Sequence, residues 1–391
     1  MGEREWKEVR LGEVCNIRRG SSPRPIKDFL SNSGMPWVKI ADATESNSRF
    51  IEKTNEFIKL SGVEKSVVVN PGSLILSNSG TAGLPKFMGL KACIHDGWQV
   101  FDNFQGINVL FLYYELLFIR NRLLHDAYDS TMKNLTLDMV RNASIDLPSM
   151  RQQKAIAATL SCLDDKIELN NRINKTLEEI AQAIFKSWFV DFEPFQDGEF
   201  EDSELGRIPK GWRVGTLGNI ASITSGKRPL KKEDTHIKEM RIPVVGASNV
   251  MGYTNKALYN EKILITGRVG THGIIQRFNT PCWPSDNTLV IKSGKHEFTY
   301  QVLKSIDFQS INRGSTQPLI TQTDLKNITI VIPSDIVLKN FEAIISELMI
   351  LLKENNNQTE KLTAIRDTLL PKLMSGEIRV PIEEVTTDKQ G

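Results

Sequence analysis

The sequence lacks the features of membrane and disulfide-rich proteins. Its longest apolar stretch, residues 107–119, contains Glu115 and is shorter than the about 20 helical residues that cross a bilayer. The first residues are charged and include no apolar segment typical of a secretory signal. The four cysteines form no C-x-x-C pair, which argues against a zinc knuckle or a disulfide framework. We therefore expect a cytoplasmic protein with no membrane partner.

The sequence also lacks the short motifs of common enzymes. It contains no G-x-x-x-x-G-K-[ST], H-E-x-x-H or G-x-S-x-G motif, no G-x-G-x-x-G after a strand, and no N/D-P-P-Y/F tetrapeptide of aminomethyltransferases. The five histidines show no ligand spacing, so we predict neither a metal site nor a catalytic residue. The glycine-rich residues 267–273 could cradle a phosphate, but without a lysine a hairpin or loop is favoured. Asp96 and Asp286 have no evident base partner and are interpreted as loop or core residues.

The chain contains two copies of one design. At an offset of 206 residues, seven aromatic, aliphatic, glycine and proline positions recur: Trp6, Leu11, Gly12, Val14, Ile17, Gly20 and Pro23 match Trp212, Leu217, Gly218, Ile220, Ile223, Gly226 and Pro229. The offset falls to 190 where Gly80 and Gly83 match Gly270 and Gly273, and to 185 where Pro148 matches Pro333. A repeat of this kind fixes the architecture before any single motif is interpreted. We interpret the shared positions as framework.

Each copy mixes strands and helices. Short β-branched and aliphatic runs bounded by Gly, Pro, Asn and Ser predict strands at 72–78, 143–148, 262–267, 287–292 and 328–333. Helical periodicity without proline or glycine predicts helices at 111–129 and 299–313. The fold class of each globular half is therefore α+β.

A heptad pattern follows each globular half. Apolar positions step by three and four from Ile156 to Trp188, and again from Phe341 to Leu373. Two helices of about 50 to 60 Å result. Chain connectivity favours an antiparallel coiled-coil pair, which would relate the two halves by a pseudo-two-fold axis. We expect this division of the chain: globular half 1–149, long helix 150–190, acidic linker 191–211, globular half 212–333, long helix 334–376 and C-terminal tail 377–391.

Both heptad patterns are polar at mid-length. Asn170 and Asn174 of the first helix would face Asn355 and Thr359 of the second. Polar side chains at such positions specify register at some cost in stability. The alternative is that these side chains face solvent where the helices pack loosely.

The near-neutral total charge hides a basic region. Residues 205–333 carry 18 Lys and Arg against 8 Asp and Glu, whereas residues 1–149 carry 18 against 17. Residues 150–204 are acidic, with 6 basic and 12 acidic side chains. A basic lobe beside acidic helices suits an anionic polymer, with nucleic acid as the leading candidate. The excess could instead be a solvated face.

Several segments together resemble the specificity subunit of type I restriction-modification systems. They are two copies of W-x4-L-G-x-[VI]-x2-[IV]-x2-G-x2-P, the segment 186–212, and LLPKLMSGEIRV at 369–380. The resemblance covers nearly the whole chain. It implies two target recognition domains, separated by two long antiparallel helices that act as a ruler, each domain reading half of an asymmetric bipartite site in double-stranded DNA.

The same resemblance implies that the chain is not itself catalytic. Two methyltransferase subunits and the restriction and translocase subunits would join it, so S-adenosylmethionine, ATP and Mg are expected on those partners and no cofactor on this chain. The complex would direct adenine methylation or restriction. An alternative from another class is a coiled-coil scaffold whose basic lobe binds RNA or a protein partner.

Loop side chains with long donors or amides are the candidates for DNA binding, because Arg and Lys pair with guanine edges and Asn and Gln with adenine. In the first half these are Arg19, Arg24, Lys27, Asn78, Lys86 and Lys133. In the second half they are Arg228, Lys231, Lys232, Arg268, His272, Arg313 and Gln317. Each could equally contact phosphate or remain solvated.

Overall fold

The computed structural model describes residues 6–46, 48–128, 134–314 and 318–381. The chain divides into two compact units, Met1–Arg172 with Asn355–Gly391, and Ile173–Glu354. Each unit combines one globular half with one stretch of each long helix. No helix among the described residues is long and apolar enough to span a membrane.

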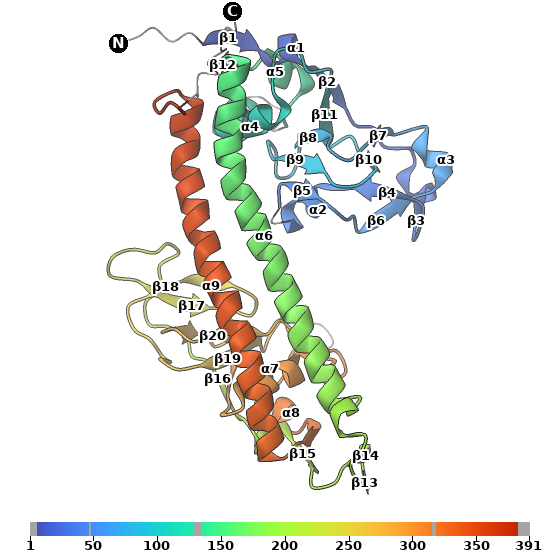
Figure 1. The fold of residues 1–391 in the computed structure, drawn as a ribbon, viewed down its shortest axis with the longest axis vertical. Coiled ribbons are helices and arrows are strands. Elements are labelled where there is room, and N and C mark those ends of the chain that lie inside the picture. The colour runs from blue at the N-terminus through green and yellow to red at the C-terminus, as the bar shows by residue number, and fades with distance from the viewer. Residues whose placement is uncertain (1–5, 47, 129–133, 315–317, 382–391) are drawn as a thin grey trace, which may run out of the picture. The chain divides into compact units, whose positions relative to one another are not determined.

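The first globular half contains two five-stranded sheets (Figure 1). One has the order β2-β11-β8-β9-β5, with bounds Asn16–Arg19, Trp98–Asp102, Leu74–Ser77, Pro85–Met88 and Phe50–Ile51. The other has the order β3-β6-β4-β10-β7, with bounds Leu30–Ser31, Glu56–Ile58, Met35–Val38, Ala92–Ile94 and Val67–Val69. A third, two-stranded sheet pairs β1 (Lys7–Arg10) with β12 (Ser144–Leu147). The helices are α1 (Leu11–Val14), η1 (Ile26–Asp28), α2 (Ile40–Glu45), α3 (Leu60–Val63), α4 (Val109–Tyr128) and α5 (Leu137–Asn142).

The second globular half repeats this topology with fewer strands. Its sheets have the orders β16-β22-β19-β20, β18-β17-β21 and β15-β23. The strands are β15 (Arg213–Thr216), β16 (Ser222–Ser225), β17 (Ile242–Val245), β18 (Val250–Thr254), β19 (Ile263–Gly267), β20 (Gln276–Phe278), β21 (Trp283–Pro284), β22 (Thr288–Lys292) and β23 (Thr329–Ile332). The helices are η3 (Leu217–Asn219), α7 (His296–Ser305) and α8 (Gln322–Lys326). Most strand pairs are antiparallel, but β4 pairs in parallel with β10 and β5 with β9 in the first half, and β17 pairs in parallel with β21 in the second.

The predicted repeat is confirmed in the backbone. Gly80 and Gly83 have φ angles of 63° and 73°, and the matching Gly270 and Gly273 have 76° and 82°. Only glycine adopts this left-handed region without a steric penalty. The same turn is therefore built twice from the same residues.

Continuous apolar runs form the central strands. The strand β8 is buried at all four positions and β19 at all five, as expected for strands covered on both faces. The helix α4 is also largely buried, including Glu115 at 2% exposure. Burial raises the pKa of Glu115 to about 8, so its carboxyl group stays mostly protonated at neutral pH.

The two heptad patterns form the helices α6 (Met150–Phe189) and α9 (Asp335–Met374), each of 40 residues (Figure 1). They run antiparallel, as predicted. In the first unit, Ile156 and Leu160 of α6 share a core with Leu373 of α9. In the second unit, Phe185 lies 6.2 Å from Phe341 between ring centroids.

One expectation about local structure is corrected. The helix expected at 299–313 is α7, which begins at His296 and ends at Ser305. After it, Asp307 accepts hydrogen bonds from the main chain of Gln309 and Ser310, which stabilises turns in place of further helix. The acidic linker 191–211 contains η2 (Glu193–Phe195) and a hairpin of β13 (Phe200–Ser203) and β14 (Gly206–Pro209).

Candidate nucleic-acid interface

An equivalent loop leaves the first strand of the main sheet in each globular half. Gly20 follows β2, and its N–H donates to the Trp98 carbonyl at 2.8 Å; Gly226 follows β16 and donates to the Thr288 carbonyl at 3.1 Å. The next residue, Ser21 or Lys227, donates to the carbonyl of Ile94 or Pro284. The two loops are therefore held in the same hydrogen-bond register.

Glycine is required at this point by a close backbone approach. A Cβ atom on Gly20 would lie 2.1 Å from the His95 carbonyl oxygen, and one on Gly226 would lie 2.1 Å from that of Ser285. No side chain fits at that distance. In each half the loop is therefore pinned against the segment that precedes β11 or β22.

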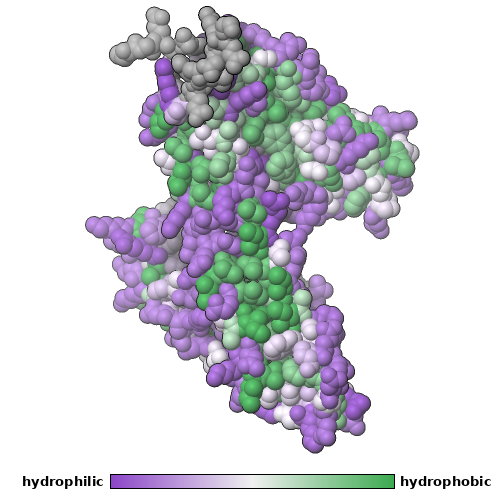
Figure 2. Space-filling model, in the orientation of Figure 1, coloured by the Kyte–Doolittle hydropathy of each residue, from purple (hydrophilic) through white to green (hydrophobic). Residues whose placement is uncertain are grey.

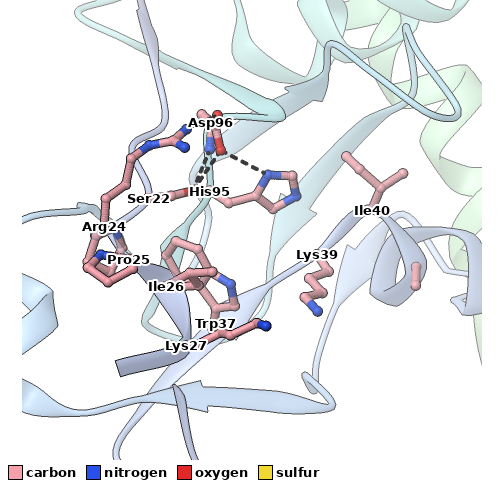
Figure 3. Close-up of a pocket in the computed structure, with 12 residues that line it drawn as sticks. Ser22, Arg24, Pro25, Ile26, Lys27, Trp37, Lys39, Ile40, His95 and Asp96 are labelled. Carbon is pink, nitrogen blue, oxygen red and sulfur yellow. Dashed lines mark hydrogen bonds and ion pairs between the residues drawn. The ribbon is translucent and has the colours of Figure 1, made fainter. Parts of the chain in front are cut away.

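In the first half this loop borders a cleft of about 950 Å³. Figure 3 shows the side chains of Arg24, Ile26 and Lys27 from the loop together with those of Trp37 and Lys39. The lining is mostly apolar at its base, where Trp37 is 2% exposed, and carries cationic side chains around it. A groove of this character suits a polyanion whose bases enter the apolar part.

Asp96 organises the polar side of this cleft. Its carboxylate accepts a hydrogen bond from the Ser22 hydroxyl at 2.6 Å and forms an ion pair with Arg24 at 3.3 Å (Figure 3). The hydrogen bond from Ser22 is the main cause that lowers the pKa of Asp96 below its ordinary value, and Arg24 adds to it. Asp96 is therefore ionised at neutral pH. Asp96 lies in the turn between β10 and β11, as the interpretation of a loop residue has it, and its carboxylate lines the cleft.

The neighbouring His95 is neutral at neutral pH. Burial lowers the pKa of its imidazole, although Asp96 acts in the opposite direction. Its Nδ1 accepts a hydrogen bond from the Gly97 N–H at 2.8 Å. His95 therefore packs in the cleft wall as a neutral ring and adds no positive charge.

Three of the residues predicted from the first half lie at this surface. Arg24 and Lys27 line the cleft and are exposed. Arg19 is also exposed, and its Nε donates to the Asp96 carbonyl at 2.8 Å. Whether any of them contacts a base stays a prediction. Lys133 lies outside the described residues.

The prediction that Asn78 and Lys86 bind DNA is corrected. Asn78 is 4% exposed and its amide donates to the Asp96 carbonyl at 2.9 Å. Lys86 is 6% exposed, and its ammonium group donates to the carbonyls of Ser46 and Ser48. Burial lowers the pKa of Lys86 to about 8. Both side chains satisfy the protein's own main chain, so neither is available to read a base.

In the second half, the loop after Gly226 exposes Arg228, Lys231 and Lys232. Lys232 pairs with Asp234 at 2.9 Å, and its ammonium also donates to the Met251 carbonyl. The residue that occupies the position of Arg24 is Leu230, whose exposure is 99%. Sequence reasoning missed it, because an apolar residue carries no donor.

The remaining candidates of the second half lie on separate segments. Arg268 is half-buried after β19, and its main chain bonds to Asn287 and Ile320. The ring of His272 stacks on Phe308 with centroids 6.2 Å apart. Arg313 forms an ion pair with Asp324 that leaves its side chain 64% exposed. Gln317 lies outside the described residues.

The predicted polar contact between the long helices is present in the first unit. Asn170 is fully buried, and its amide donates to the Thr359 hydroxyl at 3.3 Å, to the Asn355 carbonyl at 3.4 Å and to Gln358 at 2.9 Å. Asn174 belongs to the other unit and is half-buried. That these residues set the register stays a prediction.

A charged network joins the first globular half to the helices of its unit. Arg49 is 7% exposed and binds Glu168 at 3.0 Å, and it also pairs with Asp165. One turn away, Asp164 accepts hydrogen bonds from Tyr114 and Arg366, both at 2.7 Å. Because every charge in this network has a partner of opposite sign, it is suited to holding the half in place and not to chemistry. Among the described residues no group of three or more His, Cys, Asp or Glu could hold a metal ion.

Comparison with known proteins gives a consistent result. The type I restriction enzyme MjaIX specificity subunit of Methanocaldococcus jannaschii is 28% identical over 96% of this chain and 94% of its own length. The HindI specificity subunit of Haemophilus influenzae is 24% identical over 96% of this chain and all of its own. The crystal structure of a type I restriction-modification S subunit from M. genitalium shares the fold, with a TM-score of 0.59, 16% identity, and coverage of 95% of this chain and 97% of that one.

The sequence profile described as "Type I restriction modification DNA specificity domain" matches twice, at residues 3–179 and 209–363. The two matches fall on the two copies of the repeat, each with the larger part of the long helix that follows it. The chain therefore belongs to the family of type I restriction-modification DNA specificity proteins.

Proposed function

We propose that this chain is the DNA-recognition subunit of a type I restriction-modification complex, in which each globular half reads one part of an asymmetric bipartite site. The single observation that carries the proposal is the duplication of one DNA specificity domain in which the same pinned loop presents different side chains. A shared backbone with unshared surface side chains suits two related but different half-sites. The basic balance of residues 205–333, 18 against 8, supports binding to a polyanion.

The chain would supply recognition and no chemistry. Partner methyltransferase subunits would bind S-adenosylmethionine and transfer the methyl group to adenine, and restriction subunits would use ATP and Mg. The role of this chain is to hold those subunits on a chosen sequence. The proposal therefore assigns the cofactors to the partners.

The long helices offer a surface to such partners. Figure 2 shows apolar residues gathered on the face where α6 and α9 are visible. In the second unit the exposed large apolar side chains on these helices are Ile173, Ile180, Ile336, Ile344, Ile350 and Leu351. Apolar side chains concentrated on one surface are typical of a protein interface. We propose that methyltransferase subunits cover them.

The first test is single-molecule sequencing of adenine methylation in the source cell, with and without this gene and with the gene restored. We expect one bipartite motif to disappear on deletion and to return on restoration. The salt dependence of duplex DNA binding by the assembled complex gives a second readout, because phosphate contacts produce a steep slope. Two results together would favour a scaffold that binds RNA or protein. Every methylated motif would survive deletion of the gene, and the affinity of the complex for duplex DNA would not rise as the salt concentration falls.

The partner surface is tested by the double variant Ile350→Glu/Leu351→Glu, since each side chain is 50% exposed. We expect loss of co-purification with the methyltransferase subunit, and loss of methylation at all sites alike. The matched control is Leu60→Glu, because Leu60 is 73% exposed and belongs to α3 of the first globular half, not to a long helix. Normal assembly of the double variant would place the partner elsewhere.

A further inference from the structure

The pinned loops allow the two globular halves to be compared residue by residue. From Gly20 and Gly226 the chain runs four residues, through Pro23 and Pro229, to Arg24 and Leu230. The same offset of 190 that places Trp98 opposite Thr288 places Asp96 opposite Asp286. Equivalent hydrogen bonds of the two glycines and of the residues after them fix this alignment in space as well as in sequence.

We propose that this loop position determines base specificity in both halves: Arg24, positioned by Asp96, reads a guanine in the first half-site, and Leu230 contacts a thymine methyl group at the matching place in the second. The inference rests on the proposed function and names the residues that make the half-sites differ. It concerns one base pair of each half-site.

Arg24 has the exposure and the support that a base-reading arginine needs. Its side chain is 79% exposed at the edge of the cleft, and one terminal nitrogen lies 3.3 Å from the Asp96 carboxylate. Guanidinium has five N–H donors in a fixed plane, so a contact at one nitrogen leaves a pair of donors for guanine O6 and N7. Orienting the side chain before binding reduces the rotamer entropy that is lost on contact.

Asp96 is a positioning residue in this arrangement. The Ser22 hydroxyl at 2.6 Å holds its carboxylate, and the Asp96 main-chain carbonyl accepts from Arg19 and Asn78. An aspartate held by these three neighbours gives Arg24 a rigid partner. Its negative charge also disfavours a phosphate at this spot, so the arginine is directed toward a base edge.

In the second half the same backbone position carries a side chain with no hydrogen-bonding group. Leu230 is 99% exposed, so its whole side chain is accessible to a ligand. Contact with an apolar group in the bound state would remove this surface from water, which is favourable. Arg228, Lys231 and Lys232 surround it in the sequence and would hold the phosphates. The thymine methyl is the apolar group that the major groove presents.

The experiment replaces these residues in the full chain, co-expressed with its methyltransferase subunits, and sequences the methylated sites. Arg24→Ala is expected to lower discrimination at one guanine of the first half-site by roughly ten- to a hundredfold, with the second half-site unchanged. Asp96→Asn should relax the same base pair to a smaller extent. Leu230→Arg should create a preference for guanine at one position of the second half-site, because Asp286 stands where Asp96 does and is exposed.

Arg18→Gln is the matched control. Arg18 forms an exposed ion pair with Asp102 at 2.6 Å in the same half and does not line the cleft, so both half-sites should stay as they are. If Arg24→Ala fails to assemble, Arg24→Lys provides the test in its place, because lysine keeps the positive charge but lacks the bidentate donor geometry of arginine.

The outcomes separate the inference from the function on which it rests. An unchanged first half-site in Arg24→Ala, or equal weakening at all sites without a change of motif, would overturn the inference and assign Arg24 to phosphate. The bipartite motif itself would still depend on the gene. If deletion of the gene removed no methylated motif, the proposed function itself would be overturned.

Discussion

The two globular halves share a backbone design but are joined to their helices by different chemistry. In the first unit, Arg49 crosses to Glu168 and Asp165 on α6. In the second unit, Phe298 of α7 packs on Phe189 of α6 with ring centroids 4.9 Å apart, and Phe189 packs equally closely on Phe341 of α9. Both halves share an apolar core with their helices, to which the first copy adds a polar network and the second an aromatic cluster.

The second copy adds one charged contact to its aromatic cluster. Glu342 of α9 accepts hydrogen bonds from the main-chain N–H groups of Glu297 and Phe298, at 3.1 and 2.8 Å. These N–H groups open α7 and have no partner within the helix. The carboxylate therefore anchors the start of α7, and the phenylalanine rings fill the space behind it.

The comparison teaches which features a repeat preserves. The paired glycines and their hydrogen bonds are kept because a close backbone approach and a left-handed turn admit no substitute. The contacts to the helices are kept in part, as an apolar core in each copy. The additions to that core differ, because aromatic packing and paired charges can each help to hold a domain on a helix. The surface positions Arg24 and Leu230 differ as well. Backbone geometry is the inherited part, and side-chain chemistry is the variable part.

The largest expected effect on stability comes from emptying the aromatic cluster. Phe341 is fully buried and contacts three other phenylalanine rings. Phe341→Ala should lower the free energy of unfolding of the second unit by about 3 to 5 kcal/mol, since a large cavity remains. Hydrogen exchange of peptides from β19, β22 and α7 in the full chain measures the loss. The loss of stability should be nearly independent of salt concentration.

Ile344→Ala is the control for this variant, because Ile344 lies on the same helix and is 42% exposed. Its effect should stay below about 1 kcal/mol. A loss for Phe341→Ala that appeared equally in peptides of the first unit would show that the aromatic cluster is not specific to the second.

The sequence predicted the large features of both halves. The heptad patterns predicted α6 and α9, because the apolar face of a long helix is set by local periodicity. The repeat could be predicted because glycine, proline and tryptophan positions recur. The antiparallel arrangement followed from connectivity. These features depend on residues that are near one another in sequence or that are matched by a fixed offset.

The site was less accessible to sequence reasoning because its partners are distant. Asp96 is separated by 74 residues from Ser22 and by 72 from Arg24, so nothing local distinguished it from an ordinary loop carboxylate. Asn78 and Lys86 resemble exposed donors in sequence, yet folding buries them against main-chain carbonyls. Burial of a single polar side chain is a property of tertiary packing, which local patterns do not encode.

A smaller effect is expected from breaking the polar network of the first unit, and it should differ in kind. Burial alone would raise the pKa of Glu168, but the hydrogen bonds from Arg49 outweigh it and lower that pKa. The contribution of Glu168 is therefore present above the ordinary pKa of a glutamate and is lost as pH falls through the lowered value. Arg49→Met leaves the carboxylate 13% exposed without its main partner and should cost about 3 kcal/mol near pH 7.

The pH dependence separates this mechanism from simple loss of packing. In Arg49→Met the guanidinium no longer lowers the pKa of Glu168, while the Ser48 hydroxyl and the main-chain N–H of residue 49 still donate to it. The pKa of Glu168 should therefore be higher in the variant than in the wild type, and the stability difference between the two should grow as pH rises from 4 to 7. Hydrogen exchange of peptides from β5, β9 and α4 across this range gives the difference, with the exposed pair variant Arg18→Gln as a control expected to stay below about 1 kcal/mol. A difference that did not grow with pH would mean that Arg49 holds the first half by the packing of its side chain, as the phenylalanines hold the second.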